Sequence, residues 1–142
     1  MVKNTGRGSP SEIELLKIIC EEAKKSGKIT GSHLARLSEI FGQRFNKAWK
    51  ALLEGRVKRY RFKPSGRVVW IVVGKKRDYL VMPNADFCTC DDFYYRVMDG
   101  MAHLCYHLIA QKIAESLGWY DKITELDELY DTLMREWRSI ES

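Results

Sequence analysis

Cys88-Thr89-Cys90 and Cys105-Tyr106-His107 are the stretches that decide the fold, with fourteen residues between them. Together they contain three of the four cysteines and one of the three histidines in the 142-residue chain. Three thiolates and one imidazole are the number and kind of ligands that a tetrahedral zinc ion takes. The spacing therefore predicts one zinc site built from two separate parts of the chain.

The two ligand pairs are expected in different secondary structures. Side chains two apart on an extended strand point the same way, so Cys88 and Cys90 can present both sulfurs to one point. Residues two apart on a helix are separated by about 200°, so Cys105 and His107 cannot both face a metal from mid-helix. We expect Cys105 at or just before the first turn of a helix and His107 within it. The apolar run of that helix is Leu108, Ile109, Ile113 and Leu117.

The order CxC, spacer, CxH resembles the SWIM zinc finger, a ββα module. Asp92-Phe93 after the second cysteine and Leu108 after the histidine fit the family's pattern, and the resemblance covers about residues 67 to 117. It implies that one structural zinc ion is bound by Cys88, Cys90, Cys105 and His107. His103 departs from the small residue or proline more usual there; we interpret it as a surface or packing residue, the alternatives being a competing ligand or a partner of a ligand.

The cysteines have two other possible roles besides zinc binding. Cysteines are often buried as small apolar residues or paired in disulfides in oxidising compartments. Three cysteines with a histidine are an odd set for disulfides, and Met1-Val2-Lys3-Asn4 does not begin an apolar export signal. We therefore expect a cytoplasmic protein with reduced thiols, with association with the nucleoid left open. Cys20 is expected to be a core residue.

The charges are divided unevenly along the chain. Residues 1–76 contain 18 Lys and Arg against 6 Asp and Glu, whereas residues 77–142 contain 6 against 13. The halves thus carry +12 and −7, within a net charge of +5. A few charges merely solvate a surface, but an excess of this size favours polyanion binding. We expect DNA as the partner of the basic half and a protein as the partner of the acidic half.

The basic half is predicted to contain three short helices followed at once by a β-hairpin. The first helix opens with a capping box in Ser9-Pro10-Ser11-Glu12 and ends near Ser26-Gly27; the second runs from a cap at Thr30 or Ser32 to Gly42; the third spans Gln43 to Leu53. The hairpin consists of Val57 to Phe62, a turn from Lys63 to Gly66, and Arg67 to Val73. This order is that of a winged helix-turn-helix.

The strand from Arg67 to Val73 is expected to pair on both sides, because a further strand, Tyr79 to Met82, leads to the first cysteine pair. We therefore predict an α+β fold in which a winged-helix-like region and a zinc module share one antiparallel β-meander and one core. The predicted units are a disordered tail (1–8), a winged-helix-like basic domain (9–66), a SWIM zinc finger (67–118) and a C-terminal amphipathic helix (119–142).

The last helix is predicted to follow a stop at Gly118 and to begin at Asp121 or Thr124. Its first turns would hold acidic residues that favour the positive end of the helix dipole, namely Glu125, Asp127 and Glu128. Its apolar stripe would be Ile123, Leu126, Tyr130, Leu133, Trp137 and Ile140, widened by Leu129 and Met134. The stripe would either pack on the helix of the zinc module or dock on a partner. The candidate partner-binding residues are Leu126, Leu129, Tyr130, Leu133 and Trp137.

The candidate nucleic-acid-binding residues come from the third helix and the hairpin. If Phe45, Ala48, Trp49 and Leu52 face the core, the polar face of that helix points outward. The candidates are Arg44, Asn46, Lys47, Lys50, Lys58, Arg59, Arg61, Lys63 and Arg67. Tyr60 and Phe62 alternate with the hairpin cations and would either stack on bases or pack on the helices. A merely solvated surface would show a similar pattern; the clustering favours DNA binding, single- or double-stranded.

The sequence favours a protein that is not an enzyme. Four protein ligands leave no position on the zinc for water, and the chain has no phosphate-binding glycine loop, nucleophile elbow or HExxH motif. Small stand-alone SWIM proteins, archaeal members included, resemble accessory subunits that pair with RecA/RadA-type recombinase paralogues. The resemblance implies an accessory factor for DNA repair by homologous recombination, without strong DNA sequence preference. The alternative is a winged-helix transcription regulator with a structural zinc module.

Overall fold

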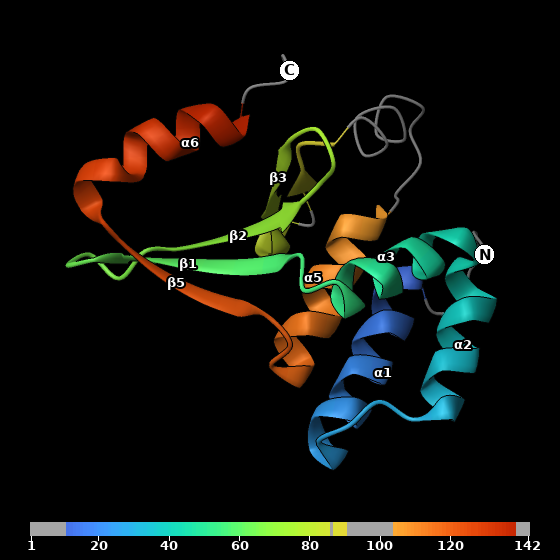
Figure 1. The fold of residues 1–142 in the computed structure, drawn as a ribbon. Coiled ribbons are helices and arrows are strands. Elements are labelled where there is room, and N and C mark those ends of the chain that lie inside the picture. The colour runs from blue at the N-terminus through green and yellow to red at the C-terminus, as the bar shows by residue number, and fades with distance from the viewer. Residues whose placement is uncertain (1–10, 86, 91–103, 139–142) are drawn as a thin grey trace, which may run out of the picture.

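The computed structural model describes residues 11–85, 87–90 and 104–138. Within this part of the chain the fold is α+β, with five α-helices and a five-stranded sheet (Figure 1). The helices are α1 (Glu12–Ser26), α2 (Gly31–Phe41), α3 (Gln43–Leu53), α5 (Tyr106–Leu117) and α6 (Tyr130–Arg138). The strands are β1 (Val57–Lys63), β2 (Val68–Val73), β3 (Asp78–Met82), β4 (Phe87–Cys88) and β5 (Asp121–Leu126). Two short 3-10 helices are η1 (Pro83–Ala85) and η2 (Asp127–Leu129).

The sheet has the strand order β4-β3-β2-β1-β5. Strands β1 to β4 are antiparallel neighbours, and β2 pairs with both β1 and β3, as predicted for the strand shared by the hairpin and the zinc module. Strand β5 joins the outer side of β1 in parallel. The predicted antiparallel meander is therefore extended by one parallel strand at its edge.

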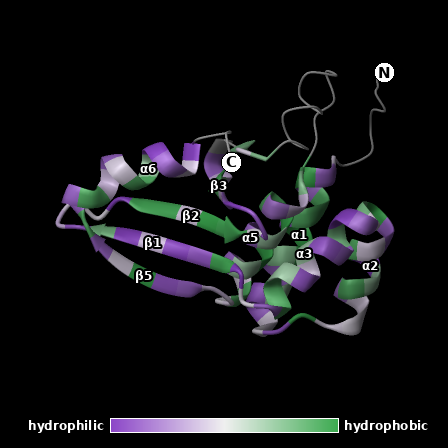
Figure 2. Cartoon of the chain, turned by 45° about the horizontal axis from the view of Figure 1, so that its top comes forward, coloured by the Kyte–Doolittle hydropathy of each residue, from purple (hydrophilic) through white to green (hydrophobic). Residues whose placement is uncertain are grey.

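Alternation of side chains along β2 divides the interior into two cores on opposite faces of the sheet. Trp70 and Val72 pack with α1, α3 and α5 in the larger core, whereas Val69 and Ile71 pack with α6 in the smaller one. Figure 1 shows α1, α2, α3 and α5 grouped at one end of the sheet, with α6 lying over the strands away from them. In Figure 2, β2 is hydrophobic along most of its length, whereas β1 and β5 are largely hydrophilic.

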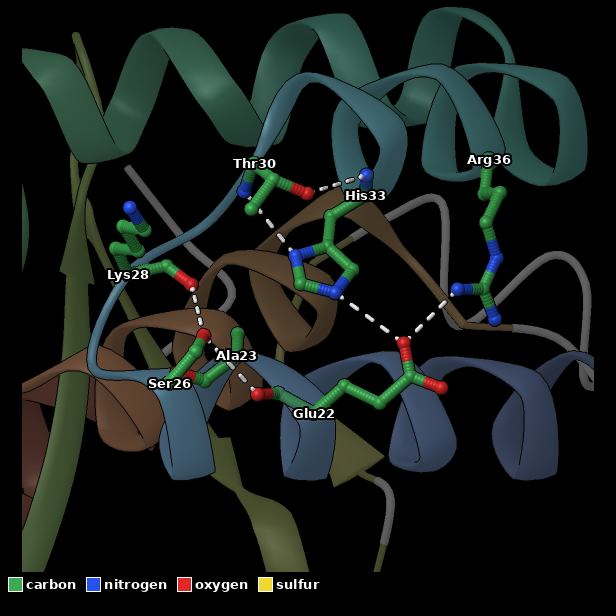
Figure 3. A network of polar contacts seen from close by, with 7 residues as sticks. All are labelled: Glu22, Ala23, Ser26, Lys28, Thr30, His33 and Arg36. Atoms are coloured by element: carbon green, nitrogen blue, oxygen red, sulfur yellow. Dashed lines mark hydrogen bonds and ion pairs between the residues drawn. The ribbon is translucent and has the colours of Figure 1, made fainter.

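A polar network joins α1 to α2 (Figure 3). Thr30 and His33 form a capping box, in which the Thr30 amide donates to His33 Nδ1 at 3.1 Å and the His33 amide donates to Thr30 Oγ1 at 3.2 Å. Glu22 of α1 accepts from Arg36 at 2.9 Å and lies 3.2 Å from His33 Nε2. The hydrogen bond from Arg36 lowers the pKa of the Glu22 carboxyl. The start of α2 is thus fixed on the side of α1.

The predicted helices of the basic half are observed with one change at the first N-terminus. Helix α3 has the predicted bounds, and α1 and α2 end at Gly27 and Gly42 as expected. The capping box, however, is formed by Ser11 and Glu14, whose amide donates to Ser11 Oγ at 3.2 Å. Ser9 and Pro10, which the prediction used, and the predicted tail lie outside the described residues.

The predicted start of the last helix is wrong. Asp121–Leu126 forms β5, and α6 begins only at Tyr130. Strand β5 occupies the outer edge of β1, where six residue pairs run from Lys58↔Asp121 to Lys63↔Leu126. Ile123 and Thr124 are β-branched and suit a strand, and pairing satisfies the backbone groups of β1 that a helix would leave exposed. The three-four spacing of apolar residues is helical only from Tyr130 onward.

The acidic residues placed in the first turns of that helix have other positions. Glu125 lies in β5, and Asp127 and Glu128 lie in η2. The Asp127 carboxylate accepts hydrogen bonds from the Ser65 amide at 3.0 Å and the Ser65 hydroxyl at 2.7 Å. Asp127 therefore holds the turn of the β1–β2 hairpin.

Helix α6 packs on the sheet, and not on the helix that follows the zinc ligands. The Trp137 ring lies 4.8 Å from that of Tyr60, and the Tyr130 ring lies 5.0 Å from that of Phe62. Trp137 and Met134 are buried in the smaller core. Tyr60 and Phe62 are thus packing residues, the second of the two roles considered for them, although the helix they contact is α6. Among the described helices, none is long and apolar enough to cross a membrane.

Candidate metal centre

The ligand atoms of Cys88, Cys90, Cys105 and His107 all lie within 4.8 Å of one another. All four side chains are buried. In a tetrahedral site with zinc–sulfur bonds of about 2.3 Å, the ligand atoms lie about 3.8 Å from one another. A small contraction of the cluster would therefore let all four atoms bind one zinc ion. The four residues that the sequence singled out are therefore brought together around one point.

Local structure positions the two ligand pairs as expected. Strand β4 ends at Cys88, so Cys90 lies just beyond the strand that was expected to hold both cysteines. Both thiols nevertheless belong to the cluster. Cys105 is the N-cap residue of α5, and its carbonyl accepts from the Ile109 amide at 3.1 Å. His107 follows in the first turn. Helix geometry thus permits two ligands two residues apart, because one of them precedes the helix.

Two arginines anchor the backbone beside the cysteines. Between Cys88 and Cys90, the Thr89 amide donates to the Leu80 carbonyl and Thr89 Oγ1 accepts from the Leu80 amide, both at 3.1 Å. Arg77 donates to the Thr89 carbonyl at 2.8 Å. On the other side, Arg44 of α3 donates to the carbonyl of Leu104 at 2.9 Å, one residue before Cys105. These contacts hold the backbone beside both ligand pairs.

His107 has the surroundings of a metal ligand. Its ring stacks on Tyr79 at 4.2 Å between centroids, and the guanidinium of Arg77 lies 4.6 Å from the centre of the Tyr79 ring on β3. Both ring nitrogens are buried and make no hydrogen bond to a nitrogen or oxygen atom of the described residues, and the side chain that interacts with the ring is the Cys90 thiol. A buried imidazole nitrogen without a hydrogen bond costs free energy of folding. A metal ion bound to one of the two ring nitrogens would offset part of that cost.

The three thiols interact strongly with one another. Hydrogen bonds from Cys105 and Cys88 lower the pKa of Cys90, whereas hydrogen bonding with Cys105 raises the pKa of Cys88. Cys90 is thus the thiol that most favours the thiolate form. Zinc binds thiolates, so its binding would replace the protons that the three sulfurs share.

These observations support one structural zinc ion held by Cys88, Cys90, Cys105 and His107. Three sulfurs and one nitrogen form a ligand set typical of structural zinc, and they fill all four positions of a tetrahedral site. The fourth cysteine, Cys20, lies outside the cluster and is buried in the larger core, as predicted.

The predicted nucleic-acid-binding residues of α3 fall into two groups. Asn46, Lys47 and Lys50 are exposed, as predicted. Arg44 was expected to face outward, but it is partly buried and forms two hydrogen bonds of 2.8 Å with the Glu12 carboxylate in addition to its bond to Leu104. Its guanidinium ties α1 and α3 to the metal site.

The predicted residues of the hairpin are also divided by the structure. Arg61 and Lys63 are exposed, and Arg59 is half-buried beside Tyr120. Lys58 forms an ion pair with Asp121 of β5. Arg67 lies over the ring of Tyr130, 4.3 Å from its centre, on the side covered by α6. Lys58 and Arg67 thus have internal partners that the sequence did not reveal.

The predicted partner-binding residues are divided in a similar way. Tyr130, Leu133 and Trp137 pack in the core between α6 and the sheet. Leu126, at the end of β5, is 56% exposed, and Leu129, in η2, is 43% exposed. Ile140 and His103 lie outside the described residues.

Sequence reasoning missed several residues that shape the metal site. Arg77, Tyr79 and Gly74 belong to a turn and strand that were assigned only by pattern. A Cβ atom on Gly74 would lie 2.6 Å from the Tyr79 ring and 2.7 Å from the Arg77 carbonyl, so only glycine fits there without displacement. The contacts of Gly74 belong to the turn between β2 and β3, whereas the stacking of Tyr79 on His107 depends on how β3 lies against α5 and has no signal in the local sequence.

The comparisons with known proteins agree with the site. No model of a known protein family matches the chain. The chain is 26% identical over 129 residues to the "Zinc finger SWIM domain-containing protein 7 homolog" of Dictyostelium discoideum, covering 89% of this chain and 81% of that protein. With the Cys/His cluster, this similarity fits a SWIM-type zinc-binding protein.

A second relative is an uncharacterised protein of Archaeoglobus fulgidus, 33% identical over 127 residues. The match covers 89% of this chain and 96% of the Archaeoglobus protein. The chain therefore belongs to the same protein family as that protein.

Proposed function

We propose that the protein is a non-enzymatic adaptor that binds zinc, DNA and a protein partner. Its role would be that of an accessory factor in DNA repair by homologous recombination, acting with a RecA/RadA-type recombinase paralogue in the cytoplasm. The absence of catalysis is supported by the metal site, where four protein ligands leave no position for a reacting water.

The observation that carries DNA binding is the group of exposed cations on α3 and β1, namely Lys47, Lys50, Arg61 and Lys63. Exposed lysine and arginine side chains can contact phosphates. Lys47 also lies over the Tyr106 ring, 6.0 Å from its centre, and its side chain is still exposed. The basic first half of the chain, at +12, adds a long-range attraction for a polyanion.

The winged-helix interpretation remains part of the proposal. Three helices followed directly by the β1–β2 hairpin have the order of a winged helix-turn-helix. In that interpretation α3 would enter a DNA groove, with Asn46, Lys47 and Lys50 on its outer face. The hairpin would lie beside it.

For the protein partner we propose the end of the molecule where Leu126 and Leu129 are exposed. Large apolar side chains exposed close together in sequence favour a contact surface. Acidic residues lie beside them, which suits a partner with a basic rim. The choice of a recombinase paralogue rests on the SWIM resemblance, which the similarity to the Dictyostelium protein supports.

The alternative function, a winged-helix transcription regulator, makes a different prediction. A regulator would bind one duplex sequence as a symmetric dimer, whereas an accessory factor would bind DNA with little sequence preference. Selection from a random duplex library separates the two, because only a regulator would enrich a defined palindromic site.

Affinity purification from the native cell tests the partner. The intact chain should recover an ATPase of the recombinase class, identified by mass spectrometry, and Leu126→Glu with Leu129→Glu should lose it. Ile18→Glu, the same kind of change at a residue of α1 that is 45% exposed, serves as the control. Recovery of the same ATPase by the double variant would contradict the proposed surface.

Reversal of Lys47 and Lys50 to Glu should weaken DNA binding at low salt, and unchanged affinity would contradict the role of α3.

A further inference from the structure

We propose that single-stranded DNA binds across the face of the sheet that α6 leaves uncovered. This open face is defined by Arg59, Arg61 and Lys63 of β1, Lys122 of β5, and Tyr120 with Trp119 at its edge. The inference rests on the proposed DNA binding and adds the surface and the form of the DNA.

The register of the strands determines which side chains share this face. Tyr60 and Phe62 point toward α6, so the alternating residues Arg59, Arg61 and Lys63 point to the opposite side. Lys122 pairs with Arg59 across the parallel β1–β5 ladder and therefore lies on the same side. Cations at every second residue of β1 repeat at about 6.6 Å along the strand.

The helical end of the molecule covers only part of this side of the sheet. Val57, Trp70 and Val72 are buried there against the helices. Farther along the strands, Arg61, Lys63 and Lys122 are exposed. The Lys122 ammonium also lies 6.0 Å from the centre of the Tyr120 ring. Figure 1 agrees, with α1, α2, α3 and α5 gathered at one end and the outer parts of β1, β2 and β5 extending beyond these four helices.

Charge is separated between the two faces. The described strands contain three carboxylates: Asp78, Asp121 and Glu125. All three lie on the α6 side. In β5, Asp121 pairs with Lys58 and Glu125 pairs with Phe62, and both partners point to that side. In β3, Asp78 pairs with Val73, which packs in the smaller core. The open face therefore has four cations from β1 and β5 and no strand carboxylate. Leu126 pairs with Lys63 and is exposed at the outer end of this face, so the DNA and the proposed protein partner would meet there. A surface of this composition is complementary to a phosphate backbone.

Aromatic rings lie where the open face meets the helices. Trp119 is 41% exposed and packs against Trp49 of α3 at 5.7 Å between ring centroids. The next residue, Tyr120, contacts Trp70 at 4.8 Å and lies beneath Arg59, whose guanidinium is 5.9 Å from the ring centre. Arg59 and Lys122 both lie over the Tyr120 ring, so Tyr120 positions these cations. Trp119, held by packing on one side and exposed on the other, is the platform for an unpaired base.

The shape of the surface favours a single strand over a duplex. The major groove of a duplex admits one helix or a two-stranded ribbon, whereas the open face spans β2, β1 and β5. In a duplex the bases are also stacked on one another and cannot reach Trp119. A single strand can place its phosphates along β1 and turn bases toward the aromatic edge.

Fluorescence anisotropy with the full zinc-loaded chain tests the proposal. The probes are one labelled mixed-sequence oligonucleotide of about 20 nucleotides and its duplex. We expect the single strand to bind at least about tenfold more tightly. Arg61→Gln with Lys122→Gln should weaken it about tenfold and reduce the slope of log affinity against log salt by about 1.4, since each phosphate contact contributes about 0.7.

Two further variants separate charge from stacking. Lys24→Gln with Lys25→Gln removes the same charge from the exposed end of α1 and should change the affinity less than about twofold. Trp119→Ala should weaken single-strand binding about tenfold and leave the salt slope unchanged. Circular dichroism and zinc content verify the fold of each variant. If Trp119→Ala fails this check, the Arg61 and Lys122 variant decides alone.

The outcomes distinguish this inference from the proposed function. Equal or tighter binding of the duplex, or an Arg61 and Lys122 variant no weaker than the α1 control, overturns the inference. If only the double variant Lys47→Gln with Lys50→Gln loses affinity for the single strand, the inference is also overturned. DNA binding through α3 would then still stand. If the native chain binds neither probe at low salt, the proposed DNA-binding function itself is wrong.

Discussion

Among single residues, Cys90 provides the most direct test of the zinc site. Its thiol lies in the buried cluster and is the sulfur that most favours the thiolate. A serine hydroxyl is a poor zinc ligand, so Cys90→Ser should reduce bound zinc from about one ion per chain to well below half. Plasma mass spectrometry on protein refolded with zinc measures this. Cys20→Ser, outside the cluster, should retain the full amount; equal zinc in both variants would rule out Cys90 as a ligand.

Gly74 lies where a larger residue would collide with the residues that support the metal site. Alanine there would press on the Tyr79 ring, which stacks on His107, and on the Arg77 carbonyl. We expect Gly74→Ala to lower the free energy of unfolding by about 1–3 kcal/mol, because the backbone carbonyl cannot yield. Urea unfolding of the zinc-loaded protein gives the value.

Gly31→Ala is the matched control for that substitution. A Cβ atom on Gly31, at the start of α2, meets nothing within 4 Å. Alanine favours a helix over glycine, so this variant should be unchanged or more stable by up to about 1 kcal/mol. Similar losses for both glycines would show that the contacts of Gly74 are unimportant.

At the scale of elements, α6 depends on the sheet that it covers. Trp137 is buried against Tyr60 and anchors the smaller core. Trp137→Ala should therefore cost about 3–5 kcal/mol and speed amide exchange in α6. Glu136→Ala, exposed on the same helix, should stay within about 0.5 kcal/mol of the native protein. A loss below about 1 kcal/mol for Trp137→Ala would mean that α6 is not held by this contact.

The elements also show where sequence patterns are sufficient. Helices α1, α2 and α3 were predicted because each combines an apolar face with local end signals, such as the glycines that follow them. Strand β5 was predicted as helix, since Ile123, Leu126 and Tyr130 fit a helical spacing by chance. The edge of β1, about sixty residues away in sequence, offers β5 a ladder that no local pattern records.

At the scale of the whole molecule, the zinc site is part of the main core. Cys88, Cys90 and Cys105 belong to the same buried cluster as Leu16 of α1 and Phe45 of α3. Metal binding energy should therefore stabilise the N-terminal helices as well as the ligand segments.

Chelation tests this coupling. Treatment with a strong chelator under reducing conditions should lower the midpoint of thermal unfolding by more than about 10 °C, as expected for a loss of several kcal/mol. Far-ultraviolet circular dichroism follows the helices, and added zinc should restore the original midpoint. Retention of the helical signal and the midpoint without zinc would show that the site and the core are energetically separate.

By itself, the sequence determined the zinc ligands, the α+β class and the three N-terminal helices. These features depend on residue type and on spacings within one element or one ligand pair, which local chemistry specifies. Only the tertiary structure decided that residues 121–126 form a strand, that α6 covers one face of the sheet, and which cations have internal partners. Arg44, Lys58 and Arg67 illustrate the reason: their partners Glu12, Asp121 and Tyr130 lie far away in sequence, and folding alone brings them into contact.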